Sequence, residues 1–151
     1  MGSRKTSRSL SNVPNPKDVA SRERLDLGVV PDTVVVAAAT AFLEGALKYG
    51  RYNWRIAGVK ASVYDAALRR HRKKWWNGEN RDPATRVKHL ASIIACAGIL
   101  LDAELVGKLT DDRPPRANIT DAIDDATEVC RHLRRLLVDH SPHQYTIEDG
   151  E

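Results

Sequence analysis

Three carboxylates stand where they could bind a metal ion, one in an apolar segment and two at the end of a basic one. Glu44 is the single carboxylate of "VVVAAATAFLEGALKY", residues 34–49. A buried carboxylate needs a partner, and the candidates are Lys48 four residues on, an arginine of another helix, or a divalent ion. Glu79 and Asp82 form an E-x-x-D pair, and such oxygen ligands suit Mg²⁺ or Mn²⁺. The alternatives are a surface ion pair of Glu44 with Lys48 and a capping role for Asp82 before Pro83.

Two histidines lie in helical patterns, His71 and His89. Neither has zinc-binding spacing to another His or Cys, and no His-Asp dipeptide occurs. A histidine can accept a proton near neutral pH, although a single histidine in a helix is more often structural. The two cysteines, Cys96 and Cys130, indicate neither a disulfide framework nor a zinc finger. This cysteine usage favours a reducing, cytoplasmic setting.

The segment "KYGRYNWR", residues 48–55, collects three cations with two tyrosines, a tryptophan and an asparagine. A second cationic cluster occurs at 69–74, "RRHRKK". Local basic clusters suggest an anionic partner, such as a nucleotide phosphate, a nucleic acid or an acidic protein. Aromatic side chains on such a connector, Tyr52 and Trp54, can stack on a base. For Trp75 and Trp76 we favour the alternative, burial in a helical core.

The elements that must position these residues are helices. Apolar residues recur at three- and four-residue spacing and no strand alternation appears, which predicts helices over 34–49, 63–79, 84–109 and 119–140. The third of these is apolar nearly all round from Leu90 to Leu101, so we expect it to be the most buried. The fourth carries an apolar face from Ile119 to Leu137, which we expect to pack in the core. The chain is therefore predicted to be an all-α protein, a bundle of four main helices.

The chain divides into three parts on composition. Residues 1–23 form a polar, basic stretch that we expect to be a flexible arm; residues 24–140 form the helical domain, and residues 141–151 a loose tail. The 151 residues fit one domain. The N-terminus lacks the apolar segment of a secretory signal, and 90–101 is too short to span a bilayer. We therefore expect no membrane partner.

Four stretches carry a family resemblance: "RLDLGVVP", "FLEGALKYGRYNWR", "RHRKKWWNGENRDP" and "HLASIIACAGILL". In this order they resemble the phage and bacterial dATP/dGTP diphosphohydrolases, the MazZ-like branch of the all-α, MazG-like nucleoside triphosphate pyrophosphatases. The match covers about residues 24–101. The resemblance implies a helical fold assembled as a dimer or dimer of dimers. It also implies divalent-metal-dependent cleavage of a deoxypurine triphosphate, dGTP or dATP, to monophosphate and pyrophosphate. The E-E-x-x-E of better-known relatives is reduced here to Glu44.

The resemblance implies roles for the candidate residues. Glu44, Glu79 and Asp82 would hold Mg²⁺ or Mn²⁺ and serve catalysis, with His71 or a carboxylate taking the proton of the attacking water. The remaining candidates would bind the substrate: Lys48 and Arg55 the phosphates, Tyr52 or Trp54 the purine, Asn53 the base or sugar, Arg70 the leaving charge, and His89 the nucleotide. If phage-encoded, the enzyme would act in the host cytoplasm on the phage nucleotide pool.

A second interpretation remains open, a non-enzymatic nucleic-acid-binding protein that uses the basic arm and the Arg/Lys helix face. Binding of this kind weakens steeply with salt, and it has no need of Glu44, Glu79 or Asp82. We prefer the pyrophosphohydrolase on the ordered motifs, and expect a homodimer or homotetramer with no nucleic-acid partner. A nucleotide panel with product analysis separates the two.

Overall fold

The computed structural model describes residues 15–21 and 23–150, and the chain divides into two units, Met1–Asp32 and Thr33–Glu151. The first unit contains helix α1 (Pro16–Ser21) and the 3-10 helix η1 (Leu27–Val29). The Asp26 carboxylate begins η1 by accepting the backbone N–H of Gly28 at 2.8 Å. Most of the predicted basic arm, residues 1–14 and 22, lies outside the described residues.

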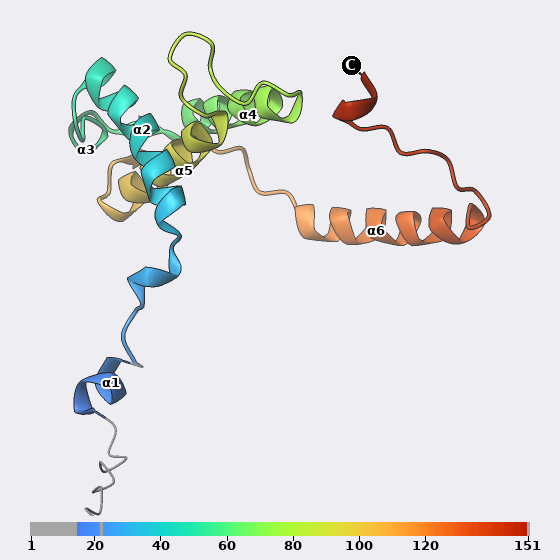
Figure 1. Cartoon of the computed structure of the whole chain (residues 1–151), viewed down its shortest axis with the longest axis horizontal. Helices are drawn as coiled ribbons and strands as arrows, with labels where there is room; N and C mark the ends of the chain where they lie inside the picture. Colours follow the sequence, from blue (N-terminus) through green and yellow to red (C-terminus); the bar gives the residue numbers. More distant parts are fainter. Residues whose placement is uncertain (1–14, 22, 151) are drawn as a thin grey trace, which may run out of the picture. The chain divides into compact units, whose positions relative to one another are not determined.

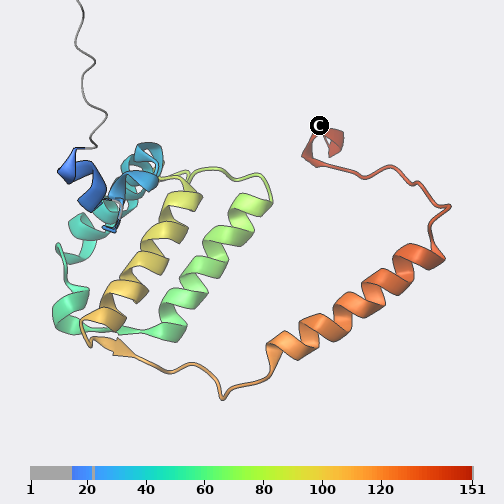
Figure 2. The ribbon, with the colours of Figure 1, turned by 90° about the horizontal axis from the view of Figure 1, so that it is seen from below.

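The second unit is built from helices, as the sequence predicts (Figure 1). Its elements are α2 (Asp32–Tyr49), α3 (Trp54–Ala57), β1 (Val59–Lys60), α4 (Ala61–Trp76), α5 (His89–Leu105), β2 (Leu109–Thr110), α6 (Ile119–Leu136) and the 3-10 helix η2 (Ile147–Gly150). Helices α4 and α5 lie side by side over most of their lengths (Figure 2). The all-α fold class is therefore confirmed; in the described part of the chain, strand is limited to the two-residue segments β1 and β2. Within this part, no helix is long and apolar enough to cross a membrane.

Small residues let α2 and α5 approach closely. Ala41 of α2 forms a buried cluster with Ala91 and Ala95 of α5. Gly98 leaves room for the Phe42 ring, because a Cβ there would lie 3.2 Å from Cζ of Phe42. Helix α5 contributes more buried residues than any other described helix, so the prediction that it is the most buried helix is confirmed.

The connector between α2 and α4 is fixed against the C-terminal end of α5. Trp54 and Val59 pack with Ala103 in a second buried cluster, and β1 pairs in parallel with β2. Gly58, with φ +76°, permits this pairing, since a Cβ at that position would lie 3.0 Å from the carbonyl oxygen of Lys108. A left-handed backbone so close to another main chain requires glycine. The connector is therefore a folded element rather than an open loop.

The predicted start of the third helix at residue 84 is wrong, because α5 begins at His89. The Asp82 carboxylate instead accepts the backbone N–H groups of Ala84 and Thr85, each at 3.0 Å. Arg86 then takes a left-handed conformation, φ +62°, and the chain reverses so that Arg81 pairs with Lys88. The prediction that Asp82 caps the start of a helix is therefore wrong, because its carboxylate caps a turn.

Two predicted buried surfaces are exposed. Trp75 and Trp76 are 36% and 72% exposed, so their assignment to the core is wrong; the α4 face that packs on α5 ends before them. None of the residues of α6 is buried, so the expected burial of the apolar face from Ile119 to Leu137 is also wrong.

Candidate active site

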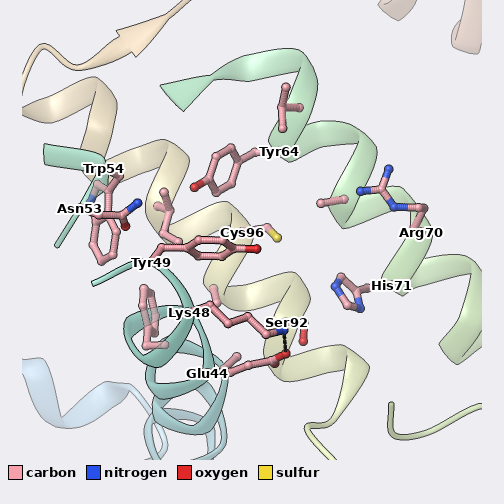
Figure 3. Close-up of a pocket in the computed structure, with 17 residues that line it drawn as sticks. Glu44, Lys48, Tyr49, Asn53, Trp54, Tyr64, Arg70, His71, Ser92 and Cys96 are labelled. Atoms are coloured by element: carbon pink, nitrogen blue, oxygen red, sulfur yellow. Dashed lines mark hydrogen bonds and ion pairs between the residues drawn. The ribbon is translucent and has the colours of Figure 1, made fainter. Parts of the chain in front are cut away.

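A cavity of about 450 Å³ opens between α2, α4 and α5 (Figure 3). Its volume lies in the range of small-molecule sites. The lining combines apolar residues with aromatic, cationic and acidic ones: Ala41, Phe42, Glu44, Gly45, Lys48, Tyr49, Asn53, Trp54, Val63, Tyr64, Ala67, Arg70, His71, Ser92, Ala95, Cys96 and Ile99. The cavity therefore offers charged and apolar surfaces to one ligand.

Glu44 and Lys48 form an ion pair one helical turn apart on the cavity side of α2 (Figure 3). The hydrogen bond to Glu44 raises the pKa of the Lys48 ammonium above its usual value. Both side chains are partly open to solvent, so the pair is free to exchange partners when an anion or cation enters. The predicted alternative, an ion pair between Glu44 and Lys48, is therefore present in the structure. Both residues also line the cavity.

A line of hydrogen bonds connects the cavity to a carboxylate outside it. His71 lines the cavity, and its Nδ1 lies 2.9 Å from Nδ1 of His89. Nε2 of His89 lies 2.8 Å from Oε1 of Glu79. His89 is fully buried, with 0% exposure, so within the described part of the chain its two ring nitrogens have these two partners alone.

The line fixes the tautomers of both neutral rings. The Glu79 carboxylate can only accept, so Nε2 of His89 carries the proton and donates it. Nδ1 of neutral His89 is then an acceptor, and Nδ1 of His71 must donate to it. This leaves Nε2 of His71 without a proton and with a lone pair to offer. His71 is thus held in the form that a general base requires.

Electrostatics keeps His71 neutral. Burial, the neighbouring His89 and the Lys74 ammonium lower the pKa of His71 below its usual value. The pKa of Glu79 is also lowered, because the carboxylate accepts hydrogen bonds from His89 and from Lys74. The tautomer assignment needs three protonation states: an ionised Glu79 carboxylate and neutral rings for both His71 and His89.

The E-x-x-D pair already holds a cation, and it is a side chain. Nζ of Lys74 lies 3.1 Å from Oε1 of Glu79 and 4.0 Å from Oδ2 of Asp82. Neither carboxylate lines the cavity. Among the residues that the structure describes, no three His, Cys, Asp or Glu side chains gather closely enough to hold a metal ion. The three-carboxylate site thus stays a prediction to which the geometry gives no support, and of its members Glu44 alone stands in the cavity.

Asp102 of α5 holds the connector by two of its side chains. One carboxylate oxygen accepts from Nε1 of Trp54 at 2.6 Å and from Nε of Arg55 at 2.8 Å, and the other from the Arg55 Nη2 at 2.7 Å. These donors lower the pKa of Asp102 to about 2. The Arg55 guanidinium also lies 5.0 Å from the ring centre of Tyr52. Bidentate pairing of this kind positions the chain.

The structure brings together six of the predicted site residues and separates five. Lining the cavity are Glu44, Lys48, Asn53, Trp54, Arg70 and His71, whereas Tyr52, Arg55, Glu79, Asp82 and His89 do not line it. His89 instead contacts the ring of His71 through their Nδ1 atoms, and Arg55 binds Asp102 and so fixes the connector. The distinction depends on which neighbours each side chain meets in space, which spacing along the chain does not give.

Four lining residues with a hydroxyl or thiol side chain were not among the predicted site residues: Tyr49, Tyr64, Ser92 and Cys96. Tyr64 stands seven residues before His71, on the same face of α4, and burial raises the pKa of its phenol. Ser92 and Cys96 come three and seven residues after His89, on the same face of α5. A helical-face count from the histidines would have found three of the four.

The site and the fold define a class, an all-α protein whose helices surround a mixed cationic, acidic and aromatic cavity. The sequence profile described as "dATP/dGTP diphosphohydrolase, N-terminal" matches residues 14–113, about two thirds of the chain. The chain therefore belongs to the dATP/dGTP diphosphohydrolase family, and the predicted family is confirmed. No curated protein and no solved structure matches it significantly. All the cavity residues lie inside the matched segment.

Proposed function

We propose that this chain hydrolyses dATP, dGTP or both at the α-phosphorus, releasing the deoxynucleoside monophosphate and pyrophosphate. The observation that carries the proposal is the cavity, which lies within the family segment and joins anion-binding side chains to an aromatic wall. Family membership supports nucleotide diphosphohydrolase activity in general. The cavity residues support the assignment of this activity to one place in the chain.

Binding depends on the two kinds of surface. Lys48 and Arg70 supply positive charge for the triphosphate, Lys48 as a point charge and Arg70 as a fork. Trp54 and Tyr49 give aromatic surface for the purine, and Asn53 gives a donor and an acceptor for a base edge or sugar. Arg55 and Tyr52, predicted to contact the nucleotide, are assigned here to holding the connector.

His71 takes the proton in the proposed reaction. A water molecule attacks the α-phosphorus, forming a P–O bond while the bond to the bridging oxygen of pyrophosphate breaks with its electron pair. Nε2 of His71 accepts the proton that the water loses, and Nδ1–H continues to donate to His89. Positioned bases of this type contribute about 10²- to 10⁴-fold to rates.

Glu44 is the residue that would hold a divalent ion. Mg²⁺ in nucleotide sites is usually bound by one or two carboxylates together with substrate phosphates and water, and a single cavity carboxylate fits this mode. Bound there, Mg²⁺ or Mn²⁺ would neutralise phosphate charge and acidify a water molecule. Mn²⁺ binding can be measured apart from catalysis, by titration calorimetry in the presence of the deoxynucleoside monophosphate product, which is not hydrolysed further.

The decisive experiment is a panel of the four dNTPs with Mg²⁺ or Mn²⁺, with products separated by chromatography. We expect dAMP or dGMP with equimolar pyrophosphate. The Arg70→Gln variant should lose turnover, whereas Arg72→Gln, two residues along α4 and outside the cavity, should keep it. No pyrophosphate from any nucleotide would refute the proposal, and salt-sensitive DNA binding without hydrolysis would favour the nucleic-acid interpretation.

We also propose that the enzyme is a homo-oligomer. Helix α5 exposes an apolar stripe at helical spacing, formed by Leu90, Ile94, Leu101 and Leu105. An exposed stripe of this kind suits a contact between copies. Light scattering of the wild type and of Leu101→Lys tests it, with a smaller assembly expected for the variant than for the wild type.

The proposal also covers the cellular compartment in which the reaction takes place. We place the reaction in the cytoplasm, where two unpaired cysteines are stable. In the MazZ-like, phage-encoded case, the enzyme would lower the deoxypurine triphosphate pool of the infected cell. Nucleotide pools measured in cells with and without the expressed chain test this part separately.

A further inference from the structure

Helix α6 carries an apolar stripe that its own chain does not bury. None of the residues of Ile119–Leu136 is buried. Even the apolar side chains of Ile119, Val129 and Leu136 are 66%, 58% and 65% exposed. The stripe recurs every three or four residues: Ile119, Ala122, Ala126, Val129, Leu133 and Leu136. This is the repeat of a two-helix seam. An 18-residue helix without packing is only marginally stable in water, so the stripe needs a partner.

Charge along α6 is divided into two halves. The acidic residues Asp121, Asp124, Asp125 and Glu128 all precede the basic residues Arg131, Arg134 and Arg135 along the helix. The helix dipole favours such charges only within the first and last turns. Asp125, Glu128 and Arg131 lie in the middle turns. Glu128 and Arg131 form an ion pair within the helix, but neither this pair nor the dipole explains why all the acidic residues come first. A partner with the reversed order of charges does.

We propose that α6 pairs antiparallel with α6 of a second copy of this chain. In this orientation the acidic half of each helix lies along the basic half of the other. The register that aligns the stripes sets Ile119 opposite Leu136 of the second copy, Ala122 opposite Leu133, and Ala126 opposite Val129. Each small residue then meets a larger one, which is the pattern of a well-packed seam. A parallel pair would align like charges along its whole length.

Engineered cysteines test the pairing and its direction in the full-length chain. Ala122→Cys and Leu133→Cys are each made with Cys130→Ser, then mixed under mild oxidation. We expect a disulfide between the two different variants and little within either one, with Cys130→Ser alone as the control. Disulfides that form within each variant would overturn the antiparallel direction. Absence of any disulfide would overturn the pairing, and α6 would then lie on its own chain or on another partner.

Charge reversal gives a second, independent readout that leaves the stripe intact. The variants Asp121→Arg/Asp125→Arg and Arg134→Glu/Arg135→Glu should each lose self-association of α6, measured as about a tenfold loss of a Cys130–Cys130 bismaleimide cross-link. Equal mixing of the two should restore the cross-link between unlike chains. Cys130 residues of an antiparallel pair lie about 7.5 Å apart along the axis in this register, within reach of a short linker. Unchanged cross-linking in both variants, or no recovery on mixing, would refute charge-directed pairing. Neither test depends on catalysis, so it stands whether or not the proposed activity is found.

Discussion

Two carboxylate–lysine groups in this protein have the same chemistry and different surroundings. Glu44 pairs with Lys48 on the cavity side of α2, whereas Glu79 and Asp82 share Lys74 outside the cavity. Both groups match the sequence description of a metal ligand. The difference is access: a ligand in the cavity would contact Glu44 directly, whereas Glu79 is connected to the cavity only through His89 and His71. An acidic motif therefore indicates a function only when its neighbours in space are known.

The largest expected effect comes from Glu44→Gln. Removing the carboxylate that lines the cavity should lower turnover by at least about 100-fold, the order found when one electrostatically stabilising group is removed from a reacting centre. Circular dichroism should be unchanged, because Glu44 is paired only with Lys48 in the described structure. Glu104→Gln, an exposed carboxylate on α5, is the matched control. Full activity of Glu44→Gln would remove the distinction between the two groups.

Glu79→Gln should have a smaller effect of a particular kind. We expect turnover to fall about tenfold, as for partners that orient a working side chain, with KM little changed. The pH profile is the readout that a merely structural role would leave unchanged. Neutral His71 is the active form and its pKa lies below 6.5, so activity should fall as pH drops through that lowered pKa. Without the Glu79 charge to favour the imidazolium, this acid limb should move to still lower pH.

His71 also links stability to pH in the same direction. Its pKa is lowered on folding, so the unfolded chain binds more protons between the folded pKa and 6.5. Stability should be complete above about pH 6.5 and decline below it, as seen in urea midpoints measured from pH 7.5 to 5. The His71→Gln variant should lose this part of the slope; an identical slope would contradict the assignment.

Asp102→Asn should weaken the connector without touching the cavity carboxylate. The Arg55 charge pair is lost, while Trp54 can still donate to the amide oxygen, so the melting temperature should fall modestly and KM should rise. The pKa of Asp102 falls to about 2 from its usual 3.8. Its contribution to stability is therefore present above about pH 4 and is lost as pH falls toward 2. Thermal melts across this range should converge for wild type and variant at the acid end.

The smallest effect is expected for Trp76→Gln. Because Trp76 is largely exposed, the free energy of unfolding should change by no more than about 0.5 kcal/mol, as for ordinary surface substitutions. Urea denaturation measures it. A loss of several kcal/mol would show that Trp76 is buried by a second copy or another partner.

The sequence predicts the helices well because their apolar periodicity is local. The predicted 34–49 agrees with α2, and 119–140 contains α6. The start of α5 is missed because Asp82 takes two backbone N–H groups into a turn, which competes with helix initiation. Burial is less predictable. The apolar stripes of α6 and of α4 near Trp76 have the same sequence pattern as the stripes that pack in the core. Whether a stripe is buried depends on which elements lie next to it.

The site is half predictable for the same reason. Glu44, Lys48, Asn53 and Trp54 come from one helix and the residues directly after it, so their grouping is set by local spacing. His71 and His89 are 18 residues apart, and their 2.9 Å contact arises from the packing of α4 on α5. Arg55 and Asp102 are likewise joined over 47 residues. Neither pair can be predicted from the type or the sequence position of its two residues.

In the proposed reaction, the buried position of His89 bears on how His71 would lose the proton that it accepts in each turnover. In the proposed reaction the products would occupy the mouth of the cavity, so a proton captured by His71 would not leave by that path until they dissociate. The ring of His89 offers a back exit: His71 can pass the proton from Nδ1, and His89 can hand on its own from Nε2 to Glu79, whose carboxylate is 42% exposed to bulk water. The relay would leave the captured proton on Nε2 of His71, so both rings must return to their starting tautomers before the next turnover.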